Sequence, residues 1–326
     1  MKIGCRAHDY GKHPAQELAL ILHNAGYQAA QVAVPKAIEG INDYQHISPE
    51  QLETLRSGFA AHDVEISVLG CYQDLSDPDA EKRAAAVQNI CRVLSWQHLA
   101  GGRCVGSETS YLHLDAEKRA ARREWMFDSV LRIVETAAKT DAIFAVEPVY
   151  WHPLDSMEVV QQLIDRVADP EHLHFIFDPA NVLENHNILH QTKLWNDWLS
   201  LIGSRIDAIH VKDFTYGSTG TYDTYGPTPL GKGCIQYAEI SKWLHQQPGH
   251  SASSGRSHPE LRRRRHCFYV CPLNPHFKPI RNLLSSFSPS SCALPFVGGH
   301  FALVTLLLLC HNKFCKTILT QLAIYD

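Results

Sequence analysis

The first 245 residues alternate short apolar runs with longer amphipathic stretches. Two of the short runs, IFAVE at 143–147 and HFIFD at 174–178, are almost continuously apolar, as expected of parallel strands that are buried on both faces. The amphipathic stretches predict helices, and one of them opens with Ser48 as a cap and Pro49 in the first turn. The pattern predicts seven strands, at Lys2–Arg6, Ala30–Val34, Glu65–Leu69, Arg103–Gly106, Ile143–Glu147, His174–Asp178 and Ile206–Lys212.

Strands that alternate with helices indicate a parallel sheet, either open and doubly wound or closed into a barrel. The open form that binds dinucleotides needs a glycine-rich turn after its first strand. Here the first strand is followed by HDYGKHPAQE, which lacks that turn. The sequence therefore favours a (β/α)8 TIM barrel, built by residues 1–245 and incomplete, because only about seven β/α units can be counted.

Composition changes abruptly near residue 246. Residues 246–326 carry nine lysines and arginines but only two acidic residues, and they hold five of the ten cysteines. We interpret this part as an aberrant, disordered tail that follows the barrel. Its apolar run at 301–310 is too short to span a membrane.

The bulk properties exclude several classes of function. A formal net charge of −4 argues against nucleic-acid binding, and we expect no membrane partner. The first residues lack the apolar run of a secretory signal, so we expect none, and the scattered cysteines of the barrel part suggest reduced thiols. We expect a cytoplasmic protein that can form homo-oligomers.

Three predicted strands end in, or contain, a residue that could bind a metal. Glu147 ends the fifth strand, Asp178 ends the sixth, and His210 lies in the seventh. The carboxyl ends of barrel strands converge on one mouth, so we expect the three side chains to meet there. Two carboxylates and an imidazole suit Mn²⁺, Mg²⁺, Co²⁺ or Zn²⁺.

The phrases AVEP, FDPANV, IHVKD and PLGKG resemble successive signatures of the xylose isomerase-like TIM-barrel superfamily, sugar-phosphate isomerase/epimerase branch. The resemblance covers residues 1 to about 245. It implies that Glu147, Asp178 and His210 bind a divalent metal, that Glu147 is also the catalytic base, and that Asn181 and Lys212 contact the substrate. His152 is a further substrate-binding candidate.

The resemblance implies a sugar or sugar-phosphate substrate and proton abstraction next to a carbonyl through an enediolate. An inosose-type dehydratase on the same fold and a catalytically inactive barrel remnant are the alternatives. A phosphate cradle at Gly231-Lys232-Gly233 is conceivable, but a tight turn is the favoured interpretation.

The eighth strand of this family, which should end in a metal-binding Glu, is missing after residue 245. One permitted set of codons for residues 250–258, read one base later, encodes Ile-Pro-Leu-Leu-Arg-Glu-Glu-Val-Ile, which resembles that strand. We hypothesise that the chain is frameshifted from about residue 251. The expected consequences are an open barrel with unpaired edges on the first and seventh strands, weak metal binding, low activity and poor solubility.

Overall fold

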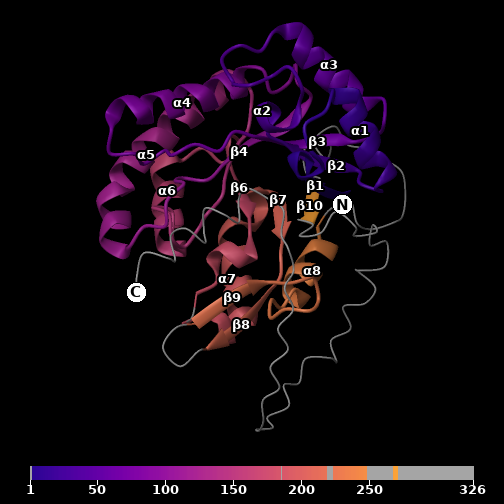
Figure 1. Ribbon diagram of the computed structural model, residues 1–326. Coiled ribbons are helices and arrows are strands. Elements are labelled where there is room, and N and C mark those ends of the chain that lie inside the picture. The colour runs from indigo at the N-terminus through magenta and orange to yellow at the C-terminus, as the bar shows by residue number, and fades with distance from the viewer. Residues whose placement is uncertain (1, 185, 219–222, 248–266, 271–326) are drawn as a thin grey trace, which may run out of the picture. The chain divides into compact units, whose positions relative to one another are not determined.

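The computed structural model describes residues 2–184, 186–218, 223–247 and 267–270 (Figure 1). The chain divides into two compact units, Met1–Phe287 and Ser288–Asp326, and every described element belongs to the first. The frameshift hypothesis and the disordered tail fall almost wholly on residues outside the described ones. Within the described part, no helix is long and apolar enough to cross a bilayer.

Seven β/α units follow one another as the sequence predicts, and the strands pair in parallel around a barrel. The strand bounds differ from the predicted ones by no more than a few residues at either end. The strands are β1 (Lys2–Arg6), β2 (Ala29–Val32), β3 (Glu65–Gly70), β4 (Gly102–Ser107), β5 (Phe144–Val146), β6 (Leu173–Phe177) and β7 (Ile206–Val211).

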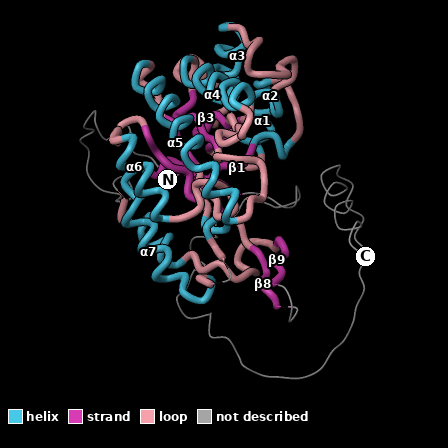
Figure 2. The backbone as a smooth tube through the Cα atoms, turned by 90° about the vertical axis from the view of Figure 1, so that its left-hand side faces the viewer, coloured by secondary structure: helices cyan, strands magenta, loops and turns pink. Residues whose placement is uncertain are grey.

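Helices connect the strands and cover the outside of the sheet (Figures 1 and 2). The helix predicted at Ser48 begins with a full capping box, in which Ser48 and Gln51 exchange side-chain-to-backbone hydrogen bonds. The helices are α1 (Ala15–Asn24), α2 (Val34–Ala37), α3 (Pro49–Ala60), α4 (Ala80–Ser95), α5 (Ala116–Lys139), α6 (Met157–Val167), α7 (Gln191–Ile202) and α8 (Ala238–His245). Short 3₁₀ turns are η1 (Ala7–Tyr10), η2 (Pro179–Val182), η3 (Ile188–His190) and η4 (Gly203–Arg205).

The expectation that β1 and β7 keep unpaired edges is wrong. A further strand, β10 (Cys267–Val270), lies between them and pairs in parallel with both, so the barrel is closed. The sequence was expected to have no strand after residue 245, because no apolar run ending in a carboxylate follows there, but backbone pairing requires only a short extended run. None of its four residues is acidic, so the metal-binding Glu expected on the eighth strand is absent from β10.

Small side chains fill the inside of the barrel. Six consecutive strands each contribute one fully buried residue to an inner layer, Ala29, Val68, Cys104, Ala145, Ile176 and Ala208. Gly106 belongs to the same crowded interior, because a β-carbon there would lie 2.6 Å from Val68. The larger apolar cluster lies between strands and helices, as in any barrel of this type.

A two-stranded hairpin, β8 (Phe214–Ser218) and β9 (Asp223–Pro227), projects after β7 and is separate from the barrel sheet. It lies in the connection between β7 and α8, which also contains the PLGKG phrase. The hairpin therefore belongs to the end of the barrel at which the polar strand ends gather.

Candidate metal centre and active site

Glu147, Asp178 and His210 meet at the carboxyl end of the barrel, as the sequence predicts. One ligand atom from each lies within 4.8 Å of those from the other two, and all three residues are buried. Nδ1 of His210 is 3.3 Å from Oε2 of Glu147 and 3.6 Å from Oδ2 of Asp178. The three side chains are thus close enough to share one cation.

The strand ends explain why these residues meet. Glu147 and Asp178 are the first residues after β5 and β6, and His210 lies one residue before the end of β7. Phe177 pairs with Ile209 in register, which brings Asp178 beside His210. A polar residue directly after an apolar strand therefore lies at the mouth of the barrel, as Glu147 and Asp178 do.

The donor set fits a divalent metal. Among the described residues, neither Oε2 of Glu147 nor Oδ2 of Asp178 accepts a hydrogen bond of ordinary geometry, although both are buried. The positive groups of His210 and Lys212 approach instead, with Nζ of Lys212 2.5 Å from Oδ2 of Asp178. Buried carboxylate oxygens that lack donors are costly unless a cation neutralises them.

The charged side chains of the site shift one another's pKa values. Burial opposes ionisation of Asp178, but Lys212 and His210 outweigh it and lower the pKa of Asp178 to about 2. Burial also opposes the charged form of His210, yet Glu147 and Asp178 raise its pKa to about 9. A proton on His210 and the Lys212 ammonium therefore occupy the place in which a cation would be bound.

Gln31, at the end of β2, fixes the imidazole of His210. Nε2 of His210 lies 2.8 Å from Oε1 of Gln31, whose Nε2 donates to the hydroxyl of Tyr72 at 2.7 Å. This series of hydrogen bonds assigns a proton to Nε2 of His210, and Nδ1 therefore faces the two carboxylates. Sequence reasoning missed Gln31 because a polar residue in a short buried strand carries no signature of its own.

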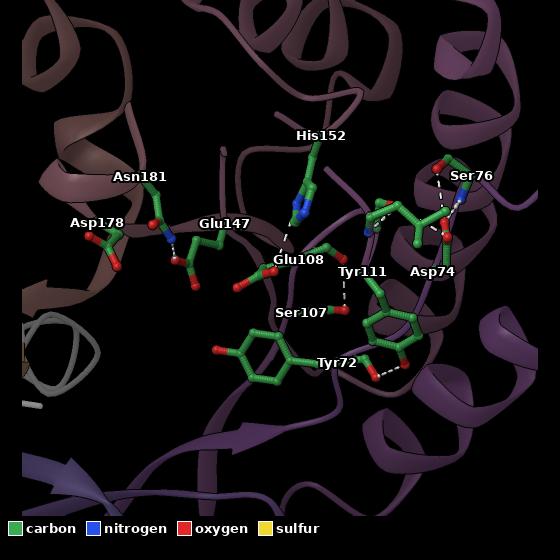
Figure 3. A network of polar contacts seen from close by, with 12 residues as sticks. Tyr72, Asp74, Ser76, Ser107, Glu108, Tyr111, Glu147, His152, Asp178 and Asn181 are labelled. Carbon is green, nitrogen blue, oxygen red and sulfur yellow. Dashed lines mark hydrogen bonds and ion pairs between the residues drawn. The ribbon is translucent and has the colours of Figure 1, made fainter. Parts of the chain in front are cut away.

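Asn181, on η2, donates through Nδ2 to Oε1 of Glu147 at 2.7 Å and is buried (Figure 3). Its position three residues after Asp178 therefore places it in direct contact with Glu147. The contact holds one oxygen of Glu147 and leaves the other facing His210. The predicted substrate-contacting role of Asn181 stays a prediction.

His152 lies in the loop after β5, and only 1% of its surface is exposed. Its Nδ1 is 3.7 Å from Oε2 of Glu108, a residue that follows β4 and that sequence reasoning missed (Figure 3). Burial lowers the pKa of His152 to about 3, and burial together with the charge of Glu147 raises the pKa of Glu108 to about 8. The pair therefore holds a neutral imidazole against a protonated carboxyl group at neutral pH.

The PLGKG phrase forms a turn, as the sequence analysis favoured. Lys232 N–H donates to the carbonyl of Pro229 at 3.0 Å. The N–H groups of Gly231 and Gly233 both donate to Oδ2 of Asp213 at 2.9 Å. Because the aspartate of the IHVKD phrase uses these donors, they are not available to cradle a phosphate.

Comparison with known proteins agrees with this geometry. The family model described as xylose isomerase-like TIM barrel matches residues 20–252. The chain belongs to this family. A search of curated proteins finds no match.

Several solved structures share the fold of this chain at low sequence identity. The apo 3-keto-D-glucoside 4-epimerase of E. coli is 14% identical with a TM-score of 0.59, over 85% of this chain and 94% of that one. A magnesium complex of a xylose isomerase-like barrel protein from Mycobacterium smegmatis is 12% identical with a TM-score of 0.59, over 83% and 89%. D-psicose 3-epimerase from Clostridium cellulolyticum H10, solved with D-tagatose, is 15% identical with a TM-score of 0.57, over 83% and 85%.

Proposed function

We propose that this xylose isomerase-like chain is a divalent-metal-dependent sugar or sugar-phosphate isomerase or epimerase, which abstracts the proton next to a carbonyl group. The observation that carries the proposal is the buried cluster of Glu147, Asp178 and His210, two of whose carboxylate oxygens lack ordinary hydrogen bonds within the described part of the chain. The sugar epimerases among the structural neighbours support the substrate class.

Each polar residue of the mouth has a role in this proposal. Glu147, Asp178 and His210 would hold the cation, and Glu147 would also take the proton from the substrate carbon. A bound divalent cation supplies polarisation of the substrate oxygens and stabilises the negative charge that develops on them. Asn181 fixes the orientation of Glu147. Lys212 would turn from Asp178 to a substrate oxygen.

The proposal includes impaired activity in this chain. Only three ligands are present in the described residues, and β10 offers no carboxylate where the family expects a fourth. An inactive barrel remnant is therefore the second candidate. It predicts folded protein without turnover, whereas the impaired enzyme retains slow proton exchange.

The test uses the purified full chain loaded with Mn²⁺, Mg²⁺, Co²⁺ or Zn²⁺ and incubated with D-fructose, D-tagatose or D-fructose 6-phosphate in D₂O. Proton NMR should show metal-dependent deuterium incorporation next to the carbonyl group, and Glu147→Gln should abolish it. Loss of water from an inosose without such exchange would favour the dehydratase instead. Absence of both reactions from folded, metal-loaded protein would contradict an enzymatic role.

We also propose that the sequence from about residue 251 arose by a one-base shift of the reading frame. Sequencing the coding DNA around codon 250 tests this directly. A chain with the frame restored should bind metal more tightly, because it regains the strand-eight Glu. An uninterrupted frame in the DNA, with no one-base slip relative to related genes, would refute the idea.

A further inference from the structure

Glu108 lies beside the candidate base because of the register of two strands. Ser107 pairs with Val146 between β4 and β5, and the N–H of Glu147 donates to the carbonyl of Ser107 at 2.9 Å. Glu108 and Glu147 are the first residues after these two strands, so the same register continued by one residue sets them opposite each other. Register-matched residues of neighbouring parallel strands project to the same side about 4.8 Å apart, so both carboxyl groups belong to the same mouth.

The backbone that carries Glu108 is held in place. The hydroxyl of Ser107 donates to the carbonyl of Glu108 at 2.8 Å and accepts the N–H of Gln73 at 3.1 Å. Figure 3 shows the Glu108 carboxyl group directed toward Glu147, with His152 approaching it from the loop after β5. The side chain of Glu108 is 30% exposed, so a molecule in the mouth can reach it.

His152 is difficult to explain as a packing residue alone. Its side chain is almost fully buried, and Nδ1 has no hydrogen-bond partner among the described residues. The nearest acidic atom to Nδ1 is Oε2 of Glu108 at 3.7 Å. A buried imidazole nitrogen without a partner is costly, and a carboxyl proton supplied from Glu108 would satisfy it.

We propose that Glu108, positioned by His152, is the second acid–base group of an isomerase reaction and serves the substrate oxygens while Glu147 serves the carbon. This inference rests on the proposed function. It assigns the proton transfers at oxygen to a residue that is not among the candidate metal ligands.

In an isomerase reaction, Glu147 and Glu108 would exchange protons with the substrate. The carboxylate of Glu147 takes the carbon-bound proton, the electrons of that bond form a carbon–carbon double bond, and the carbonyl oxygen takes the proton of Glu108. The resulting enediol loses a proton from its other hydroxyl group to the Glu108 carboxylate, which re-forms a carbonyl there. Glu147 then returns its proton to the neighbouring carbon. Both residues end in their starting states, and no electrons are gained or lost overall.

The test compares Glu108→Gln, Glu108→Ala and wild type in the metal-loaded full chain, with D-fructose and D-tagatose as probes. Glu108→Gln should lower kcat by about 100-fold or more with KM changed by less than about threefold. Metal affinity by calorimetry should stay within about threefold of wild type, because Glu108 is no ligand. Formate should partly restore kcat to Glu108→Ala by supplying the missing acid. Glu117→Gln, on the exposed start of α5, is the matched control and should behave as wild type.

Three outcomes would overturn the inference. An unchanged kcat in Glu108→Gln shows that the group is not used. A loss of metal affinity as large as that of Glu147→Gln makes Glu108 a ligand instead. A Glu108→Ala variant that folds normally but gains nothing from formate indicates a purely structural role. In each of these cases the proposed function survives, whereas wild-type protein without any exchange refutes the proposed function and the inference together.

Discussion

The hydrogen bond from His210 to Gln31 gives the sharpest test of the metal centre. Gln31 is buried, and its amide joins Nε2 of His210 at 2.8 Å to the hydroxyl of Tyr72 at 2.7 Å. Gln31→Leu keeps much of the side-chain volume but removes both bonds. The proton of His210 is then no longer held on Nε2, and Nδ1 is no longer reserved for the cation.

Loss of such an orienting partner weakens metal binding by about 10- to 100-fold, or about 1.4 to 2.8 kcal/mol. The buried imidazole of His210 and the partly buried hydroxyl of Tyr72 also lose their hydrogen bonds to Gln31, so the free energy of unfolding should fall by about 1 to 3 kcal/mol. Calorimetry with Zn²⁺ and Mn²⁺ measures the first effect, and urea unfolding of the metal-free protein measures the second. The two effects are separate because the second is present without metal.

Tyr72→Phe is the matched control, since it removes only the outer bond of the same chain. It should change metal affinity by less than about threefold, because Gln31 still accepts from His210. If Gln31→Leu folds and binds metal as tightly as wild type, the assigned orientation of His210 is wrong. If Tyr72→Phe weakens binding as much as Gln31→Leu, the effect comes from general disruption of the mouth.

Three further predictions test separate parts of the barrel. Lys212→Met should tighten metal binding several-fold in calorimetry, because it removes an ammonium group that competes for a ligand carboxylate; equal or weaker binding would contradict this. Gly233→Ala should lower Tm by several degrees, since its β-carbon would lie 2.0 Å from a carboxylate oxygen, whereas Gly231→Ala meets open space and should cost only the strain of its positive φ. Burial opposes the charge of His174, but Asp207, whose Oδ2 lies 2.6 Å from Nδ1 of His174, raises the pKa of that imidazole above its ordinary value. The stabilisation by this pair is therefore complete below about pH 6.5 and is lost as the pH rises through the folded-state pKa. Asp207→Asn should remove this pH dependence from the free energy of unfolding measured as a function of pH.

The barrel and the meeting of its three candidate ligands were predictable from the sequence for one physical reason. A parallel strand buried on both faces must be apolar, so a polar residue at its carboxyl end stands out, and Glu147 and Asp178 do so clearly. Convergence of the strand ends then places His210 with them without knowledge of any contact.

Gln31, Glu108 and β10 were not predictable in the same way. Gln31 interrupts a strand of only four residues, and Glu108 follows a strand that ends in small and polar residues, so each resembles an ordinary loop or edge residue. Their importance comes from register and from contacts between strands distant in sequence. The closing strand was missed because its pairing depends on a vacant position in the sheet and hardly on its own side chains.

The closing strand separates two tasks that a barrel usually assigns to one segment. β10 completes the ring of backbone hydrogen bonds, and Tyr269 stands in register with His210. The ring of paired strands is therefore complete although β10 offers no carboxylate to the rim. In such a protein, thermal robustness would be a poor guide to catalytic competence, because backbone pairing supports the first and side chains at the rim supply the second.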